Sequence, residues 1–259
     1  MSAERKNRLK RIVDLLVQQD RMSVKEIAMI LTVSEMTIRR DLNTLQHEGV
    51  ITRTHGGATL YDSTNPGSEM YVLGEQTEKN ARLKSAIGQR AAALIEPKET
   101  IFLDSGSTTP FIAKYLDGDT PLTVLCYTFK NASIFHNRRN TNLILAGGYF
   151  HRDSNVFHSH EGCELIKKIR ADKAFISTGG VDEHLGLTTY FYFEADIKRA
   201  MIESAKQIIL VTDSSKFNKV SITHFANLKE VNIIITDRGI PDGIKAAIRE
   251  LGIELIIAD

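Results

Sequence analysis

Small polar residues follow an apolar run near residue 100, in a pattern that suits anion binding. Residues 102–104 read Phe-Leu-Asp, the next six read Ser-Gly-Ser-Thr-Thr-Pro, and an apolar segment that predicts a helix comes after them. Small residues allow a close approach to the backbone, the amides and dipole at a helix start favour negative charge, and hydroxyl groups add donors. A phosphate fits this chemistry, although an ordinary strand-to-helix turn capped by Ser and Thr has the same pattern. The residues concerned are Asp104, Ser105, Gly106, Ser107, Thr108 and Thr109.

Three later loops repeat this chemistry after other apolar runs. They are Gly147-Gly148, Thr178-Gly179-Gly180 and Asp213-Ser214-Ser215-Lys216, and the last adds a cation to its hydroxyl groups. Ligands of parallel α/β sheets bind at the carboxyl ends of strands, where such loops meet. The four loops together therefore predict one anion pocket.

A second surface with binding chemistry lies between residues 34 and 44. If this segment is a helix beginning at Ser34, its buried side is Ile38, Leu42 and Leu45, and a rotation of about 100° per residue turns the polar residues away from that side. A duplex major groove accepts one helix, and Arg, Asn and Thr side chains can contact base edges or phosphates. The outward residues are Met36, Thr37, Arg40, Asn43 and Thr44, with Arg39 at the flank.

Two further helices are expected to position this surface. An apolar stripe from Leu9 to Leu16 predicts a helix over residues 4–19. Ser23 and Glu26 form a capping box that predicts the start of the next helix. After Gly49 the alternating residues 50–59 contain a Gly-Gly turn and predict a two-stranded wing, with Arg53 and His55 placed to contact the DNA backbone or minor groove.

The charge distribution agrees with a polyanionic partner for the N-terminal end, although a basic helix face is often merely solvated. The whole chain of 259 residues has a formal net charge of only +1. Its first 13 residues hold one acidic residue, Glu4, against five basic ones, namely Arg5, Lys6, Arg8, Lys10 and Arg11.

The loops with anion chemistry are expected to be carried by a parallel sheet covered by helices on both faces. Residues 61–75 lose periodicity and read as a linker, and Leu83, Ile87, Ala91 and Leu94 then mark a long helix. Beyond it, apolar β-rich runs alternate with helical segments, which is typical of such a sheet. The runs are Thr100–Asp104, Leu122–Tyr127, Asn142–Ala146, Lys173–Thr178, Gln207–Asp213, Asn232–Asp237 and Ile253–Ala258.

The segment SEMTIRRDLNTLQHEGVITRTHGGA, residues 34–58, resembles the recognition helix and wing of the DeoR family of bacterial regulators. The resemblance continues almost to the C-terminus, and it implies an α/β fold in two parts. These are a winged helix-turn-helix DNA-binding domain over residues 1–60 and, after the linker, a larger α/β sensor domain over 76–259 that resembles ribose-5-phosphate isomerase. It also implies that the segment from Ser34 to Asn43 reads DNA.

The same resemblance implies a sugar-phosphate pocket. It assigns the loop from Asp104 to Thr109 to phosphate or sugar capture, and the segment Phe193-Glu194-Ala195-Asp196-Ile197-Lys198 resembles the family's segment with a pocket Glu and Lys. The residues expected around the pocket are Tyr127, Gly147, Gly148, Thr178, Gly179, Glu194, Lys198, Asp213, Ser215 and Lys216.

One departure from the family pattern bears on the effector. Where most members carry Thr-Asn after the second strand, this chain has Cys126-Tyr127-Thr128, similar to the branch that regulates deoxyribonucleoside catabolism. Deoxyribose-5-phosphate is therefore one candidate effector, with other pentose, hexose and polyol phosphates still open.

We accordingly expect a repressor of a sugar or deoxyribonucleoside catabolic operon, released from its operator by a phosphorylated sugar. Its partners would be operator DNA, the effector and further copies of the chain, since one recognition helix contacts too few bases for specificity. We expect no cofactor.

Two alternatives compete with this interpretation. Glu194 as a base, with Asp182 and Lys198 beside it, would suit a sugar-phosphate isomerase, but an isomerase gains nothing from a DNA-reading helix and wing. His151, His158 and His160 would suit a metal site, but their spacing is loose and no carboxylate or Cys set completes it, so no metal is expected.

Composition excludes several other classes. With 42% hydrophobic and 25% charged residues, the chain is typical of a globular protein. Two cysteines, Cys126 and Cys163, are too few for a disulfide framework and read as packing residues. No apolar run is long enough to cross a bilayer and none follows the basic start, so we expect a cytoplasmic protein without membrane contact.

Overall fold

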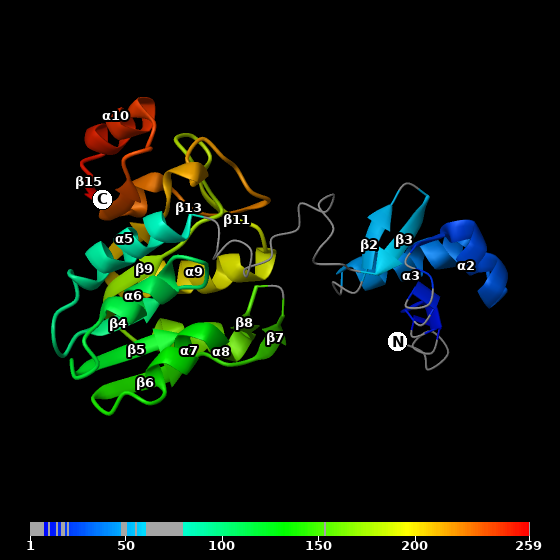
Figure 1. Ribbon diagram of the computed structural model, residues 1–259, viewed down its shortest axis with the longest axis horizontal. Coiled ribbons are helices and arrows are strands. Elements are labelled where there is room, and N and C mark those ends of the chain that lie inside the picture. The colour runs from blue at the N-terminus through cyan, green and yellow to red at the C-terminus, as the bar shows by residue number, and fades with distance from the viewer. Residues whose placement is uncertain are drawn as a thin grey trace. The chain divides into compact units, whose positions relative to one another are not determined.

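The computed structural model describes residues 8–9, 11–13, 15–16, 19, 21–47, 51–54, 56–60, 80–152 and 154–258. The chain divides into two compact units, Met1–Met70 and Tyr71–Asp259 (Figure 1). The division falls within the segment 61–75 that the sequence predicts as a linker, and that segment lies outside the described residues.

The smaller unit contains two fully described helices and three short strands. These are β1 (Arg21–Ser23), α2 (Val24–Leu31), α3 (Glu35–His47), β2 (Ile51–Thr54) and β3 (Gly57–Leu60). The described residues 8–9, 11–13 and 15–16 are helical, and the remainder of the expected helix 4–19, apart from residue 19, lies outside the described residues. The predicted capping box is present, because Ser23 Oγ accepts a hydrogen bond from the Glu26 amide at 3.2 Å and Glu26 Oε2 accepts one from the Ser23 amide at 2.7 Å.

The predicted two-stranded wing is present as the antiparallel pair β2 and β3, and β1 adds a third strand that the sequence did not predict, in the order β1-β3-β2. The additional strand β1 lies against Gly57, where a Cβ atom would be 2.2 Å from the carbonyl oxygen of Met22. Only glycine permits this approach of two backbones. Apolar residues from the first helix, α2, α3 and the sheet, among them Ile12, Ile27 and Leu42, form the core of the unit.

The larger unit is built on a seven-stranded parallel sheet in the order β15-β14-β12-β9-β4-β5-β6. Each of the seven predicted runs overlaps one of these strands, and three of the strands, β6, β9 and β12, begin one or two residues before the predicted run. Most of the central positions are buried, as expected for strands covered on both faces. The strands are β4 (Thr100–Leu103), β5 (Leu122–Cys126), β6 (Thr141–Leu145), β9 (Ala171–Ile176), β12 (Ala205–Val211), β14 (Ile233–Asp237) and β15 (Glu254–Ala258).

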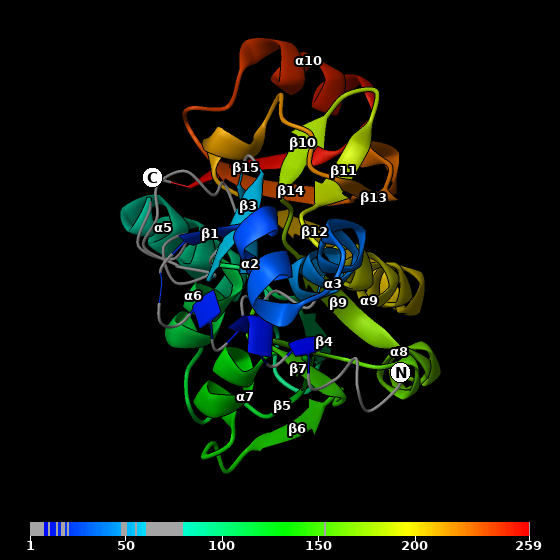
Figure 2. The same cartoon turned by 90° about the vertical axis from the view of Figure 1, so that its right-hand side faces the viewer.

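Helices cover both faces of this sheet (Figure 2). On one face α5 (Ala81–Ala92), α6 (Thr109–Tyr115) and α7 (Phe129–Phe135) enclose a core that includes Ile87 and Phe135. On the other face α8 (His160–Lys168) and α9 (Tyr192–Ser204) contribute to a second core, together with α10 (Asp242–Glu250). The helix predicted from Leu83 to Leu94 is α5.

Short strands and turns complete the unit and were not predicted from the sequence. A hairpin joins β7 (Tyr149–His151) and β8 (Val156–His158), and a second sheet has the order β10-β11-β13. Its strands are Gly180–Asp182, Gly186–Thr189 and Thr223–Ala226, and two 3-10 turns, η1 and η2, cover Ser214–Lys216 and Leu228–Glu230. Among the described residues, no helix is both long and apolar enough to span a bilayer.

The strand order places a topological switch point between β4 and β9. From β4 the chain adds β5 and β6 on one side, and it then returns to add β9, β12, β14 and β15 on the other. Loops that leave the carboxyl ends of β4 and β9 therefore diverge to opposite sides, which is where ligands bind in open α/β sheets.

Candidate functional site

Helix α3 presents the polar face that its sequence predicts. Ile38, Leu42 and Leu45 are buried, whereas Arg40 and Asn43 are exposed and the Met36 side chain is 63% exposed. Ser34 and Arg39 are also exposed, and Thr37 and Thr44 are half-buried. Ser34 Oγ accepts a hydrogen bond from the Thr37 amide at 3.2 Å, which fixes the start of the helix.

One acidic residue of α3 anchors the helix within the unit. Asp41 is 1% exposed, and its Oδ2 accepts a hydrogen bond from Arg8 Nε at 2.6 Å. Arg8 was expected only to contribute positive charge, so one member of the basic cluster also pairs with α3. Of the predicted wing contacts, Arg53 lies in β2 but its side chain is not described, and His55 lies outside the described residues.

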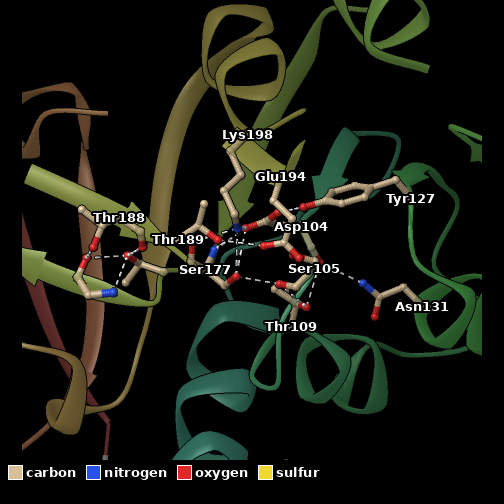
Figure 3. Close-up of polar contacts among 12 residues, drawn as sticks. Asp104, Ser105, Thr109, Tyr127, Asn131, Ser177, Thr188, Thr189, Glu194 and Lys198 are labelled. Atoms are coloured by element: carbon tan, nitrogen blue, oxygen red, sulfur yellow. Dashed lines mark hydrogen bonds and ion pairs between the residues drawn. The ribbon is translucent and has the colours of Figure 1, made fainter. Parts of the chain in front are cut away.

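In the larger unit, Asp104 is the centre of a buried hydrogen-bond network at the end of β4 (Figure 3). Its Oδ2 accepts hydrogen bonds from the Ser177 amide at 2.7 Å and from Lys198 Nζ, and its Oδ1 accepts one from the Tyr127 hydroxyl. Lys198 Nζ also donates to the Ser177 carbonyl oxygen at 3.1 Å. The residues that directly follow strands β4, β5 and β9, together with helix α9, thus each supply a member of the network.

The neighbouring titratable groups show how closely this network is enclosed. Burial raises the pKa of Glu194 above its ordinary value, although the charge of Lys198 acts in the opposite direction. Glu194 Oε2 accepts a hydrogen bond from Thr189 Oγ1 at 2.8 Å. Burial, together with the charges of Asp104 and Glu194, raises the pKa of Tyr127 well above its ordinary value, so this hydroxyl remains a donor.

Close packing holds the loops after β4 and β9 against one another. Ser177 Oγ is 2.7 Å from the carbonyl oxygen of Ser105 and 3.0 Å from Asp104 Oδ2, and its single proton serves one of them at a time. Gly106 has a φ of +109°, and a Cβ atom there would be 2.6 Å from Ser177 Oγ. The carbonyl oxygen of Asp104 accepts hydrogen bonds from Thr109 Oγ1 at 2.8 Å and from Asn131 Nδ2 at 3.1 Å.

A small cavity of about 20 Å³, room for about one water molecule, lies between these loops and the end of β12, so a phosphorylated ligand would have to move its walls apart. Lys216 supplies a cation to its wall, with its Nζ 3.3 Å from the Tyr190 hydroxyl. Asp213 supplies a carboxylate whose Oδ1 accepts a hydrogen bond from the Ser215 amide at 3.1 Å. The lining residues are Gly106, Ser107, Thr108, Ser177, Thr178, Val211, Thr212, Asp213 and Lys216.

Not every predicted pocket residue lies in this group. Gly147 and Gly148 follow β6 and contact the start of α8, where Ser159 Oγ donates to the Gly147 carbonyl oxygen at 3.0 Å. A Cβ atom on Gly148 would be 2.3 Å from the carbonyl oxygen of His158, which gives that glycine a packing reason of its own. Gly179 packs against Tyr190 and Ser221 beside the cavity.

Of the residues in the isomerase alternative, Glu194 and Lys198 lie at the buried network around Asp104. Asp182 accepts hydrogen bonds from the amides of His184 and Leu185, both at 2.9 Å, within the turn that follows β10. His151 stacks on Phe193 with ring centroids 3.9 Å apart, and no group of three or more His, Cys, Asp or Glu residues suited to a metal ion occurs in the part of the chain that the structure describes. Both cysteines are free thiols, and burial raises the pKa of Cys126 to about 12.

Several members of the site were missed by sequence reasoning. Ser177 lies inside the run Lys173–Thr178 that the sequence predicts as a strand, and Asn131 and Thr189 lie on elements without a polar motif. Lys84 falls on the buried stripe of α5 with Ile87 and Ala91, and it is 1% exposed with its Nζ 3.9 Å from Asp213 Oδ2. A lysine on an apolar stripe was the one available signal, because such a residue needs a buried partner.

Two family models match the chain, one within each unit. Residues 8–64 match the family described as "DeoR-like helix-turn-helix domain", and residues 79–238 match "DeoR C terminal sensor domain". The "Deoxyribose operon repressor" of Escherichia coli is 31% identical over 92% of this chain and 92% of that protein. The "L-fucose operon activator" of Haemophilus influenzae is 34% identical over 90% and 92%.

Among solved structures, a D-ribose-5-phosphate isomerase in complex with phospho-erythronic acid aligns with 53% of this chain and 54% of its own. Its sequence identity is 17% and the TM-score is 0.40.

Proposed function

The chain belongs to the DeoR family of DNA-binding, sugar-responsive transcriptional regulators, and we propose that this member represses a catabolic operon for a sugar or deoxyribonucleoside until a phosphorylated sugar releases it from the operator. The observation that carries the proposal is the cavity at the switch point. There the small-residue loop after β4 and the Lys216 ammonium line the same space.

The chemistry of this cavity favours a phosphate. Gly106 brings the backbone close, Ser107 and Thr108 offer hydroxyl groups, and Lys216 offers positive charge. The adjoining buried network around Asp104 would take the sugar, because a carboxylate and a phenol can hydrogen-bond to its hydroxyl groups. The proposed effector residues are thus the loop 104–109 with Tyr127, Thr178, Glu194, Lys198, Asp213, Ser215 and Lys216.

The relatives include both a repressor and an activator, so the direction of regulation is part of the proposal. The deoxyribose operon repressor and the L-fucose operon activator are similarly close to this chain. Tyr127, buried against Asp104, belongs to the Cys126-Tyr127-Thr128 departure that resembles the deoxyribonucleoside branch. We therefore propose repression, with deoxyribose-5-phosphate as the first effector to test.

Helix α3 would be the DNA-reading element of this repressor. Its 13 residues span only a few base pairs, so two or more protomers would place their α3 helices on repeated half-sites. We propose that the larger unit supplies the contact between protomers.

A titration tests the proposal. The full-length protein is bound to the DNA upstream of its own operon, and deoxyribose-5-phosphate, ribose-5-phosphate, glucose-6-phosphate and ribitol-5-phosphate are added in turn while the operator affinity is measured. One of these should lower the operator affinity, whereas inorganic phosphate should not. Absence of sequence preference for any upstream DNA would contradict the regulator function, and binding that no sugar phosphate alters would contradict this class of effector.

An Asp104→Asn variant tests the pocket separately. It should lose stability, because the buried Lys198 loses its counter-charge. The folded variant should still bind the operator but require at least about tenfold more sugar phosphate for release, since a hydrogen bond to a charged group contributes about 1.5 kcal/mol or more. Asp119→Asn, on an exposed loop, is the matched control. Normal induction of the Asp104 variant would remove this residue from the site.

A further inference from the structure

The start of α5 is joined directly to the wall of the proposed effector cavity. Asn80 precedes α5 in a left-handed conformation with φ of +58°, and its Nδ2 donates to Asp213 Oδ1 at 3.2 Å. One turn later, Lys84 Nζ is 3.9 Å from Asp213 Oδ2. The two oxygens of one cavity-lining carboxylate are thus turned toward the first turn of a helix 133 residues earlier in the sequence.

A second contact ties α5 to the anion loop. Loop 105–108 leads into α6, and α6 packs on α5 at Gly88. A Cβ atom on Gly88 would be 2.5 Å from Phe111 Cβ and 2.7 Å from the Phe111 carbonyl carbon, so the two helices can approach this closely only because residue 88 is glycine. A displacement of the anion loop is therefore transmitted to α5 by packing as well as through Asp213.

The position of Asn80 in the sequence gives this contact its importance. The chain runs from the DNA-binding unit through residues 61–79, and Asn80 is the first described residue after them. Whatever fixes the first turn of α5 therefore fixes the start of the described part of the larger unit, which is the part nearest in sequence to the DNA-binding unit.

Charge determines how a ligand would act on this contact. A phosphate monoester carries about two negative charges at neutral pH. Within the cavity it would repel the Asp213 carboxylate and attract Lys84, which is buried beside that carboxylate. The ligand thus interacts differently with the two arrangements, as any effector of a conformational equilibrium must.

We propose that Asn80 is the positioning residue through which the effector acts on DNA binding. In the effector-free protein, Asp213 holds Asn80 and the first turn of α5 in the arrangement that binds the operator. A phosphate in the cavity displaces the carboxylate from Asn80, and the turn is released. This inference rests on the proposed function, because it takes the cavity as the effector site.

Two substitutions of Asn80 test this inference in the full-length protein. Asn80→Ala removes the hydrogen bond, and Asn80→Asp places a second carboxylate against Asp213 and so imitates the repulsion by phosphate. Operator affinity is measured without ligand and with a saturating concentration of the sugar phosphate that releases the wild type. The compounds are deoxyribose-5-phosphate first, then ribose-5-phosphate, glucose-6-phosphate and ribitol-5-phosphate. Direct binding of the same compound is measured by calorimetry. Asn140→Ala is the control, since its Nδ2 donates to the Asp119 carbonyl oxygen on an exposed loop far in the sheet order from β12.

Both variants should bind the operator more weakly without ligand, and the Asp variant more weakly than the Ala variant. The ratio of operator affinities without and with ligand should fall about fivefold or more, while the Asn140 control keeps the wild-type ratio. By linkage, the ligand should bind the variants at least as tightly as it binds the wild type.

Three outcomes separate the hypotheses. An unchanged affinity ratio in both Asn80 variants would overturn the role of Asn80. Loss of calorimetric binding in both would overturn it as well, because Asn80 would then be part of the pocket itself. If the wild type binds the operator but no sugar phosphate releases it, the proposed function is contradicted. Because the wild type has an intact Asn80, this outcome is distinct from a failure of the Asn80 inference.

Discussion

The two units place their functional polar groups in opposite surroundings. On α3, Arg40 and Asn43 stand on the exposed side of the helix, above a separate apolar core. In the larger unit, Asp104 and Lys198 are 0% and 1% exposed and form part of the interior. Exposed groups can change without loss of stability, whereas the buried network stabilises the fold and, under the proposed function, also binds the effector. Substitutions in the two units should therefore separate or combine these two properties.

The largest effect is expected from Lys198→Met. It leaves the buried Asp104 carboxylate without its cation, which typically costs about 3–5 kcal/mol in the free energy of unfolding. Urea unfolding followed by far-UV circular dichroism suits a chain without Trp. Lys206→Met is the control, because that lysine is 75% exposed in its pair with Asp172 and such pairs contribute little. Equal stability of the two variants would show that the network is not structural.

Arg40→Ala should weaken DNA binding without lowering stability. The side chain is exposed on α3, so the unfolding transition should not move, but loss of a base or phosphate contact should weaken operator binding by about 1–3 kcal/mol, or roughly tenfold to a hundredfold. Sugar-phosphate binding should persist. Lys25→Ala, on the exposed side of α2, is the control, and an operator affinity unchanged by Arg40→Ala would exclude this residue from the DNA-reading face.

A smaller effect on stability is expected from Ser23→Ala, which removes the side-chain cap of α2. Loss of such a cap costs about 1 kcal/mol. The far-UV transition of the smaller unit should shift while that of the larger unit stays in place. A shift common to both transitions would mean that the two units unfold together, which would contradict the expectation that their stabilities are independent.

The smallest effect is a pH dependence carried by Glu194. Burial raises its pKa in the folded protein above the ordinary value of 4.5, and the charge of Lys198 partly offsets this. The folded state then holds the proton more tightly than the unfolded state, so stability is lost as pH rises from 4.5 through the raised pKa. Glu194→Gln should gain stability relative to the wild type across that interval and no further above it. Glu161→Gln, exposed on α8, should show no such rise, and a flat difference for Glu194→Gln would contradict the assignment.

The strands of the parallel sheet were predictable because they lie in apolar runs. Short strands and strands of mixed polarity were not predicted. Each run such as Gln207–Asp213 overlaps a strand of the parallel sheet, because strands buried on both faces are apolar almost throughout. Strand β1 and the strands of the β10-β11-β13 sheet were missed, since three or four residues carry too little periodicity. The polar loops at the strand ends were visible for the same reason as the strands, namely that they interrupt apolar runs.

Two buried ion pairs, those of Lys84 and Asp41, were not found by sequence reasoning, whereas the buried Asp104, Glu194 and Lys198 were named from the family resemblance. Lys84 and Asp41 both lie on helices where a charged residue is usually solvated, and their partners, Asp213 and Arg8, are distant in the sequence. Pairing across such distances depends on tertiary packing. The pattern of one helix predicts which side is buried but does not reveal which ion pairs will be buried with it.

The hydrogen bonds of Ser177 have a consequence for how effector preference can diverge. These bonds hold the turn that carries Gly106 against the residue that follows β9 before any ligand binds. A ligand therefore does not pay the entropic cost of ordering that turn, which favours binding of small compounds. A mutation in the fastened turn would disturb the protein whatever the inducer, so new inducers are more readily accommodated at peripheral positions. Paralogues of this regulator should therefore share the turn and differ around it.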